Sequence, residues 1–123
     1  MAEELLGWDL GILRAHGDLS SFQHRFVKIS GQKKAAFCAA GDPIVGILQN
    51  APASGRACQI RRMGLSKLDI AATVTAGQKL KAAALGKGTP VASDGDDYGA
   101  IALEGGADTQ TITVLVEFGE VTI

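Results

Sequence analysis

Residues 41–70 read GDPIVGILQNAPASGRACQIRRMGLSKLDI, and this stretch decides how the chain folds. It holds two apolar runs, at residues 44–48 and 57–63, which are separated by the segment QNAPASG. The Asn, Pro, Ser and Gly residues of that segment supply the backbone dihedral angles of a turn. Two strand-like runs joined in this way predict a β-hairpin. The hairpin carries neither a nucleophile with its base nor a metal-ligand cluster, so we expect its role to be architectural.

The second run alternates in character, as a half-buried strand does. Its two faces carry Cys58, Ile60 and Arg62 on one side and Gln59, Arg61 and Met63 on the other. Residues 64–75 repeat the alternation, which predicts a further strand after the hairpin.

The rest of the chain is also rich in short strand-like segments. They lie at residues 22–29, 33–39, 78–83, 98–103 and 111–118, and residues 85–90 read as a loop. Many short strands joined by Gly-rich turns, with little helix, predict an all-β fold, a small barrel or sandwich. A length of 123 residues favours a single domain. Because aromatic residues make up only 5% of the chain, we expect a core of small side chains supported by subunit contacts.

Charge and compartment exclude several classes of partner. The net charge is −1 and the basic residues are scattered, which argues against nucleic-acid binding. No apolar run is long enough to cross a bilayer, and the start MAEELLGWDL does not resemble a secretory signal. We therefore expect a protein made in a cytoplasm, with no membrane partner. In that compartment Cys38 and Cys58 are predicted to be reduced, buried thiols, and a disulfide between neighbouring strands is the alternative.

The first 17 residues differ from the β-rich segment 18–123. Four apolar residues alternate with Gly and Asp there, namely Leu6, Trp8, Leu10 and Ile12. A helix is disfavoured because Gly7 and Gly11 would each cost about 1 kcal/mol relative to Ala. Two interpretations have equal weight: an edge strand of the same domain, or an extended N-terminal arm that binds a neighbouring molecule.

Motifs for catalysis and for metals are incomplete. The acidic segment at residues 94–97 lacks the Glu that a calcium loop needs at its twelfth position, where this chain has Gly105. Gly88 interrupts the Lys-Thr pair of a phosphate loop, and no Ser, Cys or Asp lies in a nucleophile motif. His16 and His24 are isolated and read as surface or interface residues. We predict no catalytic residue, no metal and no cofactor, so the chain is not expected to be an enzyme.

An alternative function is suggested by Lys67. It precedes the segment VTAGQKL at residues 74–80, which is similar to part of the biotinyl and lipoyl carrier domains. Those domains carry their lysine at a hairpin tip, flanked by a Met or Asp that this chain lacks. A carrier or other small β-domain binding module is therefore the second hypothesis.

A broader resemblance covers residues 18–118. Its pieces are DLS at 18–20, FVKIS at 26–30, DPIVGILQN at 42–50 with Pro52, Ala53 and Gly55, GLSK at 64–67, AG at 76–77 and GAIALE at 99–104. In this order and spacing they resemble the head decoration (capsid-cement) proteins of tailed bacteriophages. The most specific pair is GILQN-x-P followed by G-x-SK.

This resemblance implies a structural virion protein with a β-tulip-like domain. Such proteins bind the major capsid protein on the outer surface of the expanded capsid, usually as a homotrimer, and stabilise it against internal DNA pressure. They need no cofactor, nucleic acid or membrane. A terminal arm often crosses to a neighbouring subunit or to the shell. On that basis Leu6, Trp8, Leu10 and Ile12 are the expected capsid or intersubunit binding residues.

Overall fold

The computed structural model describes residues 7–10, 13–91 and 97–120, with the backbone alone for residues 7–10 and 120. The described part is built almost entirely of strands, which confirms the all-β prediction. The strands are β1 (Gly7–Leu10), β2 (Arg14–Ala15), β3 (Phe26–Ile29), β4 (Lys34–Phe37), β5 (Gly46–Leu48), β6 (Ile60–Asp69), β7 (Lys79–Ala82), β8 (Gly88–Pro90), β9 (Asp97–Ala102) and β10 (Thr111–Glu120). One 3-10 turn, Ala84–Gly86, lies between β7 and β8.

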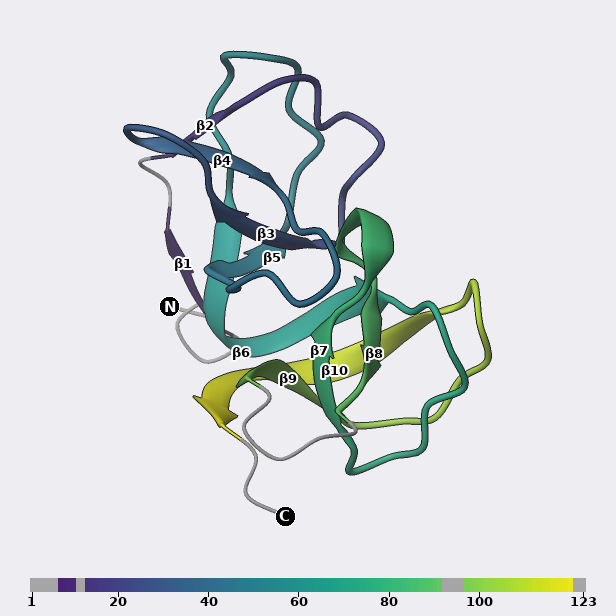
Figure 1. The fold of residues 1–123 in the computed structure, drawn as a ribbon. Coiled ribbons are helices and arrows are strands. Elements are labelled where there is room, and N and C mark those ends of the chain that lie inside the picture. The colour runs from purple at the N-terminus through teal and green to yellow at the C-terminus, as the bar shows by residue number, and fades with distance from the viewer. Residues whose placement is uncertain (1–6, 11–12, 92–96, 121–123) are drawn as a thin grey trace.

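All ten strands belong to one sheet, in the order β2-β4-β3-β5-β6-β10-β9-β7-β8, and β1 also pairs with β6. Figure 1 shows the sheet curling into two lobes about the long, bent strand β6. Each end of the sheet returns to a residue that flanks β6, through a bridge between Arg14 and Ala57 at one end and between Gly88 and Ile70 at the other. The predicted barrel thus takes the form of two small barrels. We call β2–β5 with the start of β6 the N-terminal barrel, and the rest of β6 with β7–β10 the C-terminal barrel.

Strand β6 joins the two barrels. The sequence predicted two strands that meet at Gly64 and end at residue 75, but β6 is one strand that ends at Asp69. Gly64 has a φ of 93°, which glycine adopts without steric cost, and this backbone angle allows the strand to bend. The first part of β6 pairs antiparallel with β5, which confirms the predicted hairpin, and residues 64–69 pair antiparallel with β10.

Two hydrophobic cores fill the two barrels. The core of the C-terminal barrel contains Phe26, Cys38, Ile47, Leu68, Ile70, Val74, Leu80, Ala82, Ala100, Ala102, Ile112, Val114 and Val116. The core of the N-terminal barrel contains Leu13, Ala15, Leu19, Val27, Ala35, Leu48, Cys58 and Ile60.

Strands β3 and β5 form a wall between these cores. Successive residues point to opposite faces of a strand, so Phe26 and Ile47 enter one core while Val27 and Leu48 enter the other. Both faces of the wall are buried, which explains the continuous apolar run at residues 44–48. A Cβ atom on Gly46 would lie 2.5 Å from Cγ2 of Ile60, so only glycine fits at this crossing.

Two further local predictions are wrong. The strand predicted at residues 22–29 begins only at Phe26, because His24 takes a left-handed φ of 65°. Its backbone is held by tertiary hydrogen bonds: its N–H donates to Leu48 O at 2.7 Å, and its carbonyl accepts from the Asp69 N–H at 2.9 Å. The loop predicted at residues 85–90 includes strand β8, which pairs with β7. At His24 long-range hydrogen bonds override the local pattern, whereas β8 forms by pairing with the neighbouring strand β7 across the 3-10 turn.

The cysteines match the predicted reduced state. Cys38 and Cys58 are free and buried, and each belongs to a different core, so the disulfide alternative is excluded. Burial raises the pKa of Cys38 to about 12 and also raises the pKa of Cys58, so both thiols stay protonated at neutral pH.

Candidate interaction surface

The predicted binding residues fall around strand β1. Leu6 and Ile12 lie outside the described residues. Trp8 and Leu10 belong to β1, which pairs antiparallel with β6 and places Trp8 opposite Met63 and Leu10 opposite Ile60. Part of the expected arm is therefore a strand of the same sheet. A contact of these residues with a capsid or a second subunit stays a prediction.

The residues that follow β1 are integrated into the N-terminal barrel. Leu13 and Ala15 are buried in its core, and Arg14 pairs with Lys34 of β4. The Cys58 N–H donates to Leu13 O at 2.8 Å, and the Ala15 N–H donates to Arg56 O at 2.8 Å. Residues 13–15 thus close the barrel against the segment that precedes β6.

Beside β1, the outer face of β6 exposes apolar side chains. Met63 is 61% exposed and Leu65 is 40% exposed. The strand register continues this row through Leu115 of β10 and Ile101 of β9, both half-buried. We call these four residues the apolar strip. A hollow of about 410 Å³ adjoins it, lined by residues 62–64 and 115–118.

The apolar strip was not singled out from the sequence. Its signal was present, because Met63 and Leu65 occupy positions of β6 that alternation assigns to solvent. Apolar side chains gathered on a solvated sheet face make this strip a candidate interaction surface. Since Trp8 lies opposite Met63 in the register, the predicted site and the apolar strip are neighbours in the sheet.

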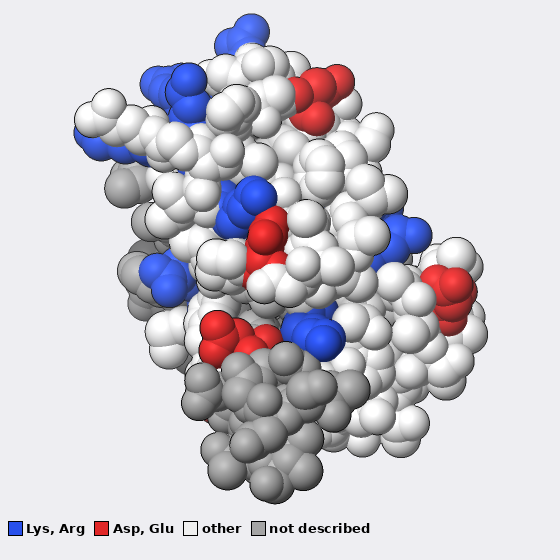
Figure 2. All heavy atoms as spheres, in the orientation of Figure 1, with Lys and Arg blue, Asp and Glu red and all other residues white. Residues whose placement is uncertain are grey.

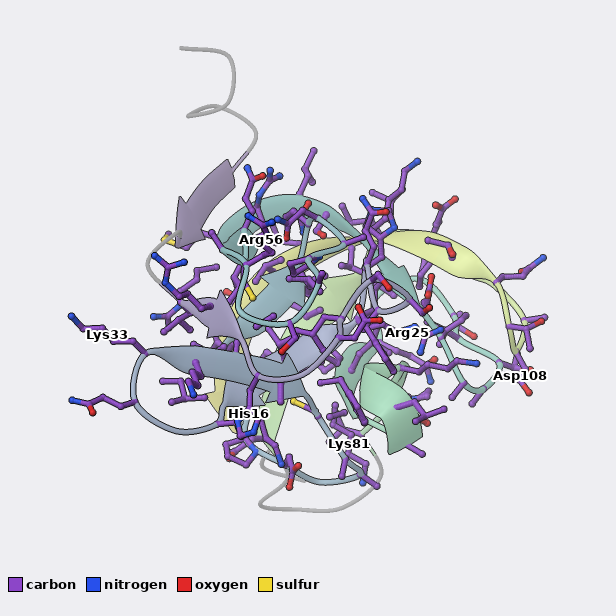
Figure 3. All side chains as sticks on the ribbon, turned by 90° about the horizontal axis from the view of Figure 1, so that it is seen from above. His16, Arg25, Lys33, Arg56, Lys81 and Asp108 are labelled. Carbon is purple, nitrogen blue, oxygen red and sulfur yellow. The ribbon has the colours of Figure 1, made fainter. Side chains whose placement is uncertain are left out.

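The described ion pairs support the fold. Arg25 Nε lies 2.7 Å from Asp69 Oδ2, and Arg25 also donates to Leu85 O at 3.1 Å, which ties the 3-10 turn to the end of β6. Figure 3 shows Arg25 beside that turn, while Lys33 points away from the molecule at the tip of the β3–β4 hairpin. Lys28 donates to Asp42 Oδ2 at 2.7 Å. This bond, with one from the Ala39 N–H, lowers the pKa of Asp42.

Charges of both signs are interspersed on the face drawn in Figure 2. Among the described residues, no group of three or more His, Cys, Asp or Glu side chains is arranged to hold a metal ion. The acidic residues 94–96 lie outside that set. No helix in the described ranges has the length and apolarity to span a membrane.

The carrier hypothesis conflicts with the position of Lys67. This residue lies within β6, opposite Thr113 of β10, and not at the tip of a hairpin. A lysine that swings between active sites needs an exposed turn, so the geometry does not favour a biotinyl or lipoyl carrier.

This chain matches known proteins by its fold and not by its sequence. No protein-family model and no curated protein sequence matches this chain. Among solved structures, it is similar to the N base of head fiber gp8.5 in bacteriophage phi29, with a TM-score of 0.73 and 12% sequence identity. The match covers 96% of this chain and 100% of that one. At this identity the likeness establishes a shared fold.

Proposed function

We propose that this chain is a structural protein of a bacteriophage virion that binds the outer surface of the expanded capsid. The observation that carries the proposal is the fold shared with a phage head fiber base, which extends over 96% of the chain. The resemblance to head decoration proteins over residues 18–118 supports it independently, because it rests on residues and not on topology. The partner is the major capsid protein, and the role requires no catalytic group, nucleic acid or membrane.

The proposed protein acts as a homotrimer that reinforces the shell against internal DNA pressure. Each copy needs only a modest interface, because symmetric copies on a preformed lattice bind with avidity. Two barrels with a common wall form a stiff scaffold for this purpose. The apolar strip together with Trp8 supplies the contact, since large apolar side chains carry most interface energy.

A pelleting experiment with expanded, undecorated phage heads tests this proposal. The protein is expected to sediment with the heads, and Trp8→Ala or Met63→Gln is expected to weaken retention about tenfold. Ile29→Gln is a matched control, because Ile29 is 62% exposed, as Met63 is at 61%, but lies in β3 away from the strip. If the Trp8 and Met63 variants are retained on the heads as well as the wild type, the apolar strip is not the contact. If the wild type does not sediment with the heads, capsid binding is rejected.

Truncation of the N-terminus tests the arm. Deletion of residues 1–14 would also remove Leu13, which is only 5% exposed in the core, so a shorter deletion of residues 1–11 isolates the effect of β1. We expect this variant to keep its far-ultraviolet circular dichroism while its capsid retention or trimer mass in sedimentation falls. A folded truncated protein that binds and assembles like the wild type would contradict the role of the arm.

A further inference from the structure

A second hollow lies where the end of β10 meets the bend of β6 (Figure 1). Its volume is about 350 Å³, and ligand pockets in proteins measure about 300–1,000 Å³. We call it the bulge pocket, and its lining residues are Pro43, Ile44, Arg62, Asp97, Tyr98, Phe118 and Gly119. It adjoins the hollow beside the apolar strip, because Arg62 and Phe118 line both.

Arg62 is the extra residue of a β-bulge in β6. The register of β1 on β6 skips it, since Trp8 lies opposite Met63 whereas the next residue, Asp9, lies opposite Arg61. A bulge changes the direction of side chains on the strand that carries it, and bulges are frequent next to functional sites. The backbone of β6 thereby presents the Arg62 side chain to the pocket.

A second bulge, in β10, presents Phe118. Val114 and Val116 are buried, and strand alternation would bury Phe118 as well. The register slips after Val116, because three steps along β10 to Gly119 match two steps along β9. Phe118 is 36% exposed instead, and Arg62 Cζ lies 5.4 Å from the centroid of its ring. The two bulges thus bring a guanidinium group onto an aromatic ring in the lining of one pocket.

The Arg62 side chain carries a buried donor. Among the residues that the structure describes, Nε of Arg62 is shielded from solvent and makes no hydrogen bond. A buried N–H group without an acceptor destabilises the folded protein, and an acceptor supplied by a ligand would remove that cost. The ligand reaches Nε when the outer torsion angles of Arg62 change, so binding is coupled to a movement of this side chain.

Strand β9 contributes an acceptor and a rigid ring to the pocket. Asp97, the first residue of β9, is exposed and brings a carboxylate to the lining. A Cβ atom on Gly119 would lie 2.6 Å from the hydroxyl oxygen of Tyr98, so glycine is needed for this ring to pack on β10. Lys79 Nζ lies 4.9 Å from the centroid of the same ring. The pocket therefore offers charges of both signs, which disfavours selection by net charge.

The remaining lining is apolar. Pro43 is exposed, while Ile44 is half-buried and packs against the core of the C-terminal barrel. A Cβ atom on Gly99 would lie 3.0 Å from Cδ1 of Ile44, so Ile44 is held close to the backbone of β9. Donor, acceptor and apolar surface together fit a ligand group that is polar at its end and apolar along its stem.

We propose that the bulge pocket binds a primary carboxamide, the side chain of a Gln or Asn residue on a protein partner. The carboxamide oxygen accepts a hydrogen bond from Nε of Arg62, and its NH₂ group donates to the Asp97 carboxylate. The methylene groups of the same side chain contact Ile44 and Pro43. A carboxylate fits less well because Asp97 repels it, and an apolar side chain would leave Nε without an acceptor.

The ligand belongs to a protein partner because the pocket adjoins the hollow beside the apolar strip, a candidate interaction surface. The inference holds for any protein that covers this surface. It therefore goes beyond the proposed capsid role and does not rest on it.

The test is a nuclear magnetic resonance titration of the full chain with the peptide acetyl-Gly-Gln-Gly-N-methylamide, whose Gln side chain is its primary carboxamide. We expect the Nε–Hε signal of Arg62 and the backbone amide signal of Asp97 to shift. Peptides with Met or Glu in place of Gln keep the same backbone. The Met peptide should bind about tenfold more weakly because it lacks the acceptor for Nε, and the Glu peptide should also bind more weakly than the Gln peptide.

Matched variants test the two polar partners. Arg62→Lys keeps the positive charge but lacks Nε, and it should weaken binding of the Gln peptide about tenfold. Asp97→Ala should weaken binding by a smaller factor, because water competes for an exposed carboxylate. Arg56→Lys makes the same replacement at an exposed position before β6 and should bind like the wild type. The comparison of the three peptides uses the wild type, so it decides the question even if a variant fails to fold.

Several results would overturn the proposal. They are an unchanged Arg62 signal with the Gln peptide, full affinity in folded Arg62→Lys, equal binding of the Met peptide, which would indicate an apolar groove, and tighter binding of the Glu peptide, which would indicate an anion site. None of these measurements uses phage heads, so a failure here is distinguishable from a failure of the capsid proposal.

Discussion

The two barrels reach the same kind of closure by different means. The C-terminal barrel is built on β6 and β10, each ten residues long, which pair in regular register. The N-terminal barrel uses strands of two to four residues before β6. Its core is completed by bonds between loops, such as Leu19 N–H to Pro52 O at 2.9 Å and Gly55 N–H to Ala15 O at 3.0 Å. The C-terminal barrel is held together by the hydrogen bonds between its long paired strands, whereas the N-terminal barrel is held together by contacts between loops. Both barrels share the wall formed by β3 and β5.

The largest effect is expected at the shared wall. Phe26 is fully buried in the core of the C-terminal barrel, so Phe26→Ala should lower the free energy of unfolding by about 3–5 kcal/mol. Leu19→Ala, in the loop-built core of the N-terminal barrel, should cost less, about 2–3 kcal/mol, because loops relax into a cavity more readily. Urea denaturation followed by circular dichroism measures both. A larger loss for Leu19→Ala, or separate transitions for the two barrels, would contradict a common wall.

A smaller effect is expected where β5 crosses β6. In Gly46→Ala the new Cβ would lie 2.5 Å from Ile60 Cγ2 and 2.6 Å from the Arg61 carbonyl oxygen. The backbone oxygen cannot rotate away, so we expect a loss of about 1–3 kcal/mol. The same urea titration measures it. An unchanged urea midpoint of unfolding would show that the wall accommodates the added methyl group, contrary to the structure.

The two thiols report which barrel opens first. Cys58 belongs to the N-terminal core and Cys38 to the C-terminal core, and both are protected by burial. Regions with few hydrogen bonds between strands unfold locally more readily. At denaturant concentrations below the unfolding transition, iodoacetamide should therefore modify Cys58 faster than Cys38. Mass spectrometry of the two peptides gives the rates. Faster modification of Cys38 would reverse the order of stability inferred for the barrels.

The smallest effect concerns acid stability. The hydrogen bond from Lys28 lowers the pKa of Asp42 in the folded protein below its usual 3.8. Ionised Asp42 therefore stabilises the folded state at pH values above 3.8. This stabilisation is lost as the pH falls through the lowered pKa of the folded state. Asp42→Asn should therefore reduce the fall in unfolding midpoint below about pH 4. Glu104→Gln is the counterpart in the C-terminal barrel, because the Thr113 N–H lowers the pKa of Glu104. Midpoints that fall as steeply in Asp42→Asn as in the wild type would contradict this account.

Periodicity alone predicted much of the C-terminal barrel. Residues 98–103 and 111–118 were predicted as strands and are β9 and β10, because alternation along a strand with one solvated face is visible in the residue order. The reduced state of Cys38 and Cys58 followed from composition and compartment in the same way.

The remaining features depend on residues far apart in the chain. The left-handed turn at His24 is stabilised by Leu48 and Asp69, and the fusion of two predicted strands into β6 depends on the bend at Gly64. The position of Trp8 opposite Met63 arises from pairing across the sheet. The sequence by itself determined the strand content and the residues that need burial, because these depend on local patterns. Only the tertiary structure decided how one strand serves two barrels, because register and shared walls are set by contacts that no local pattern contains.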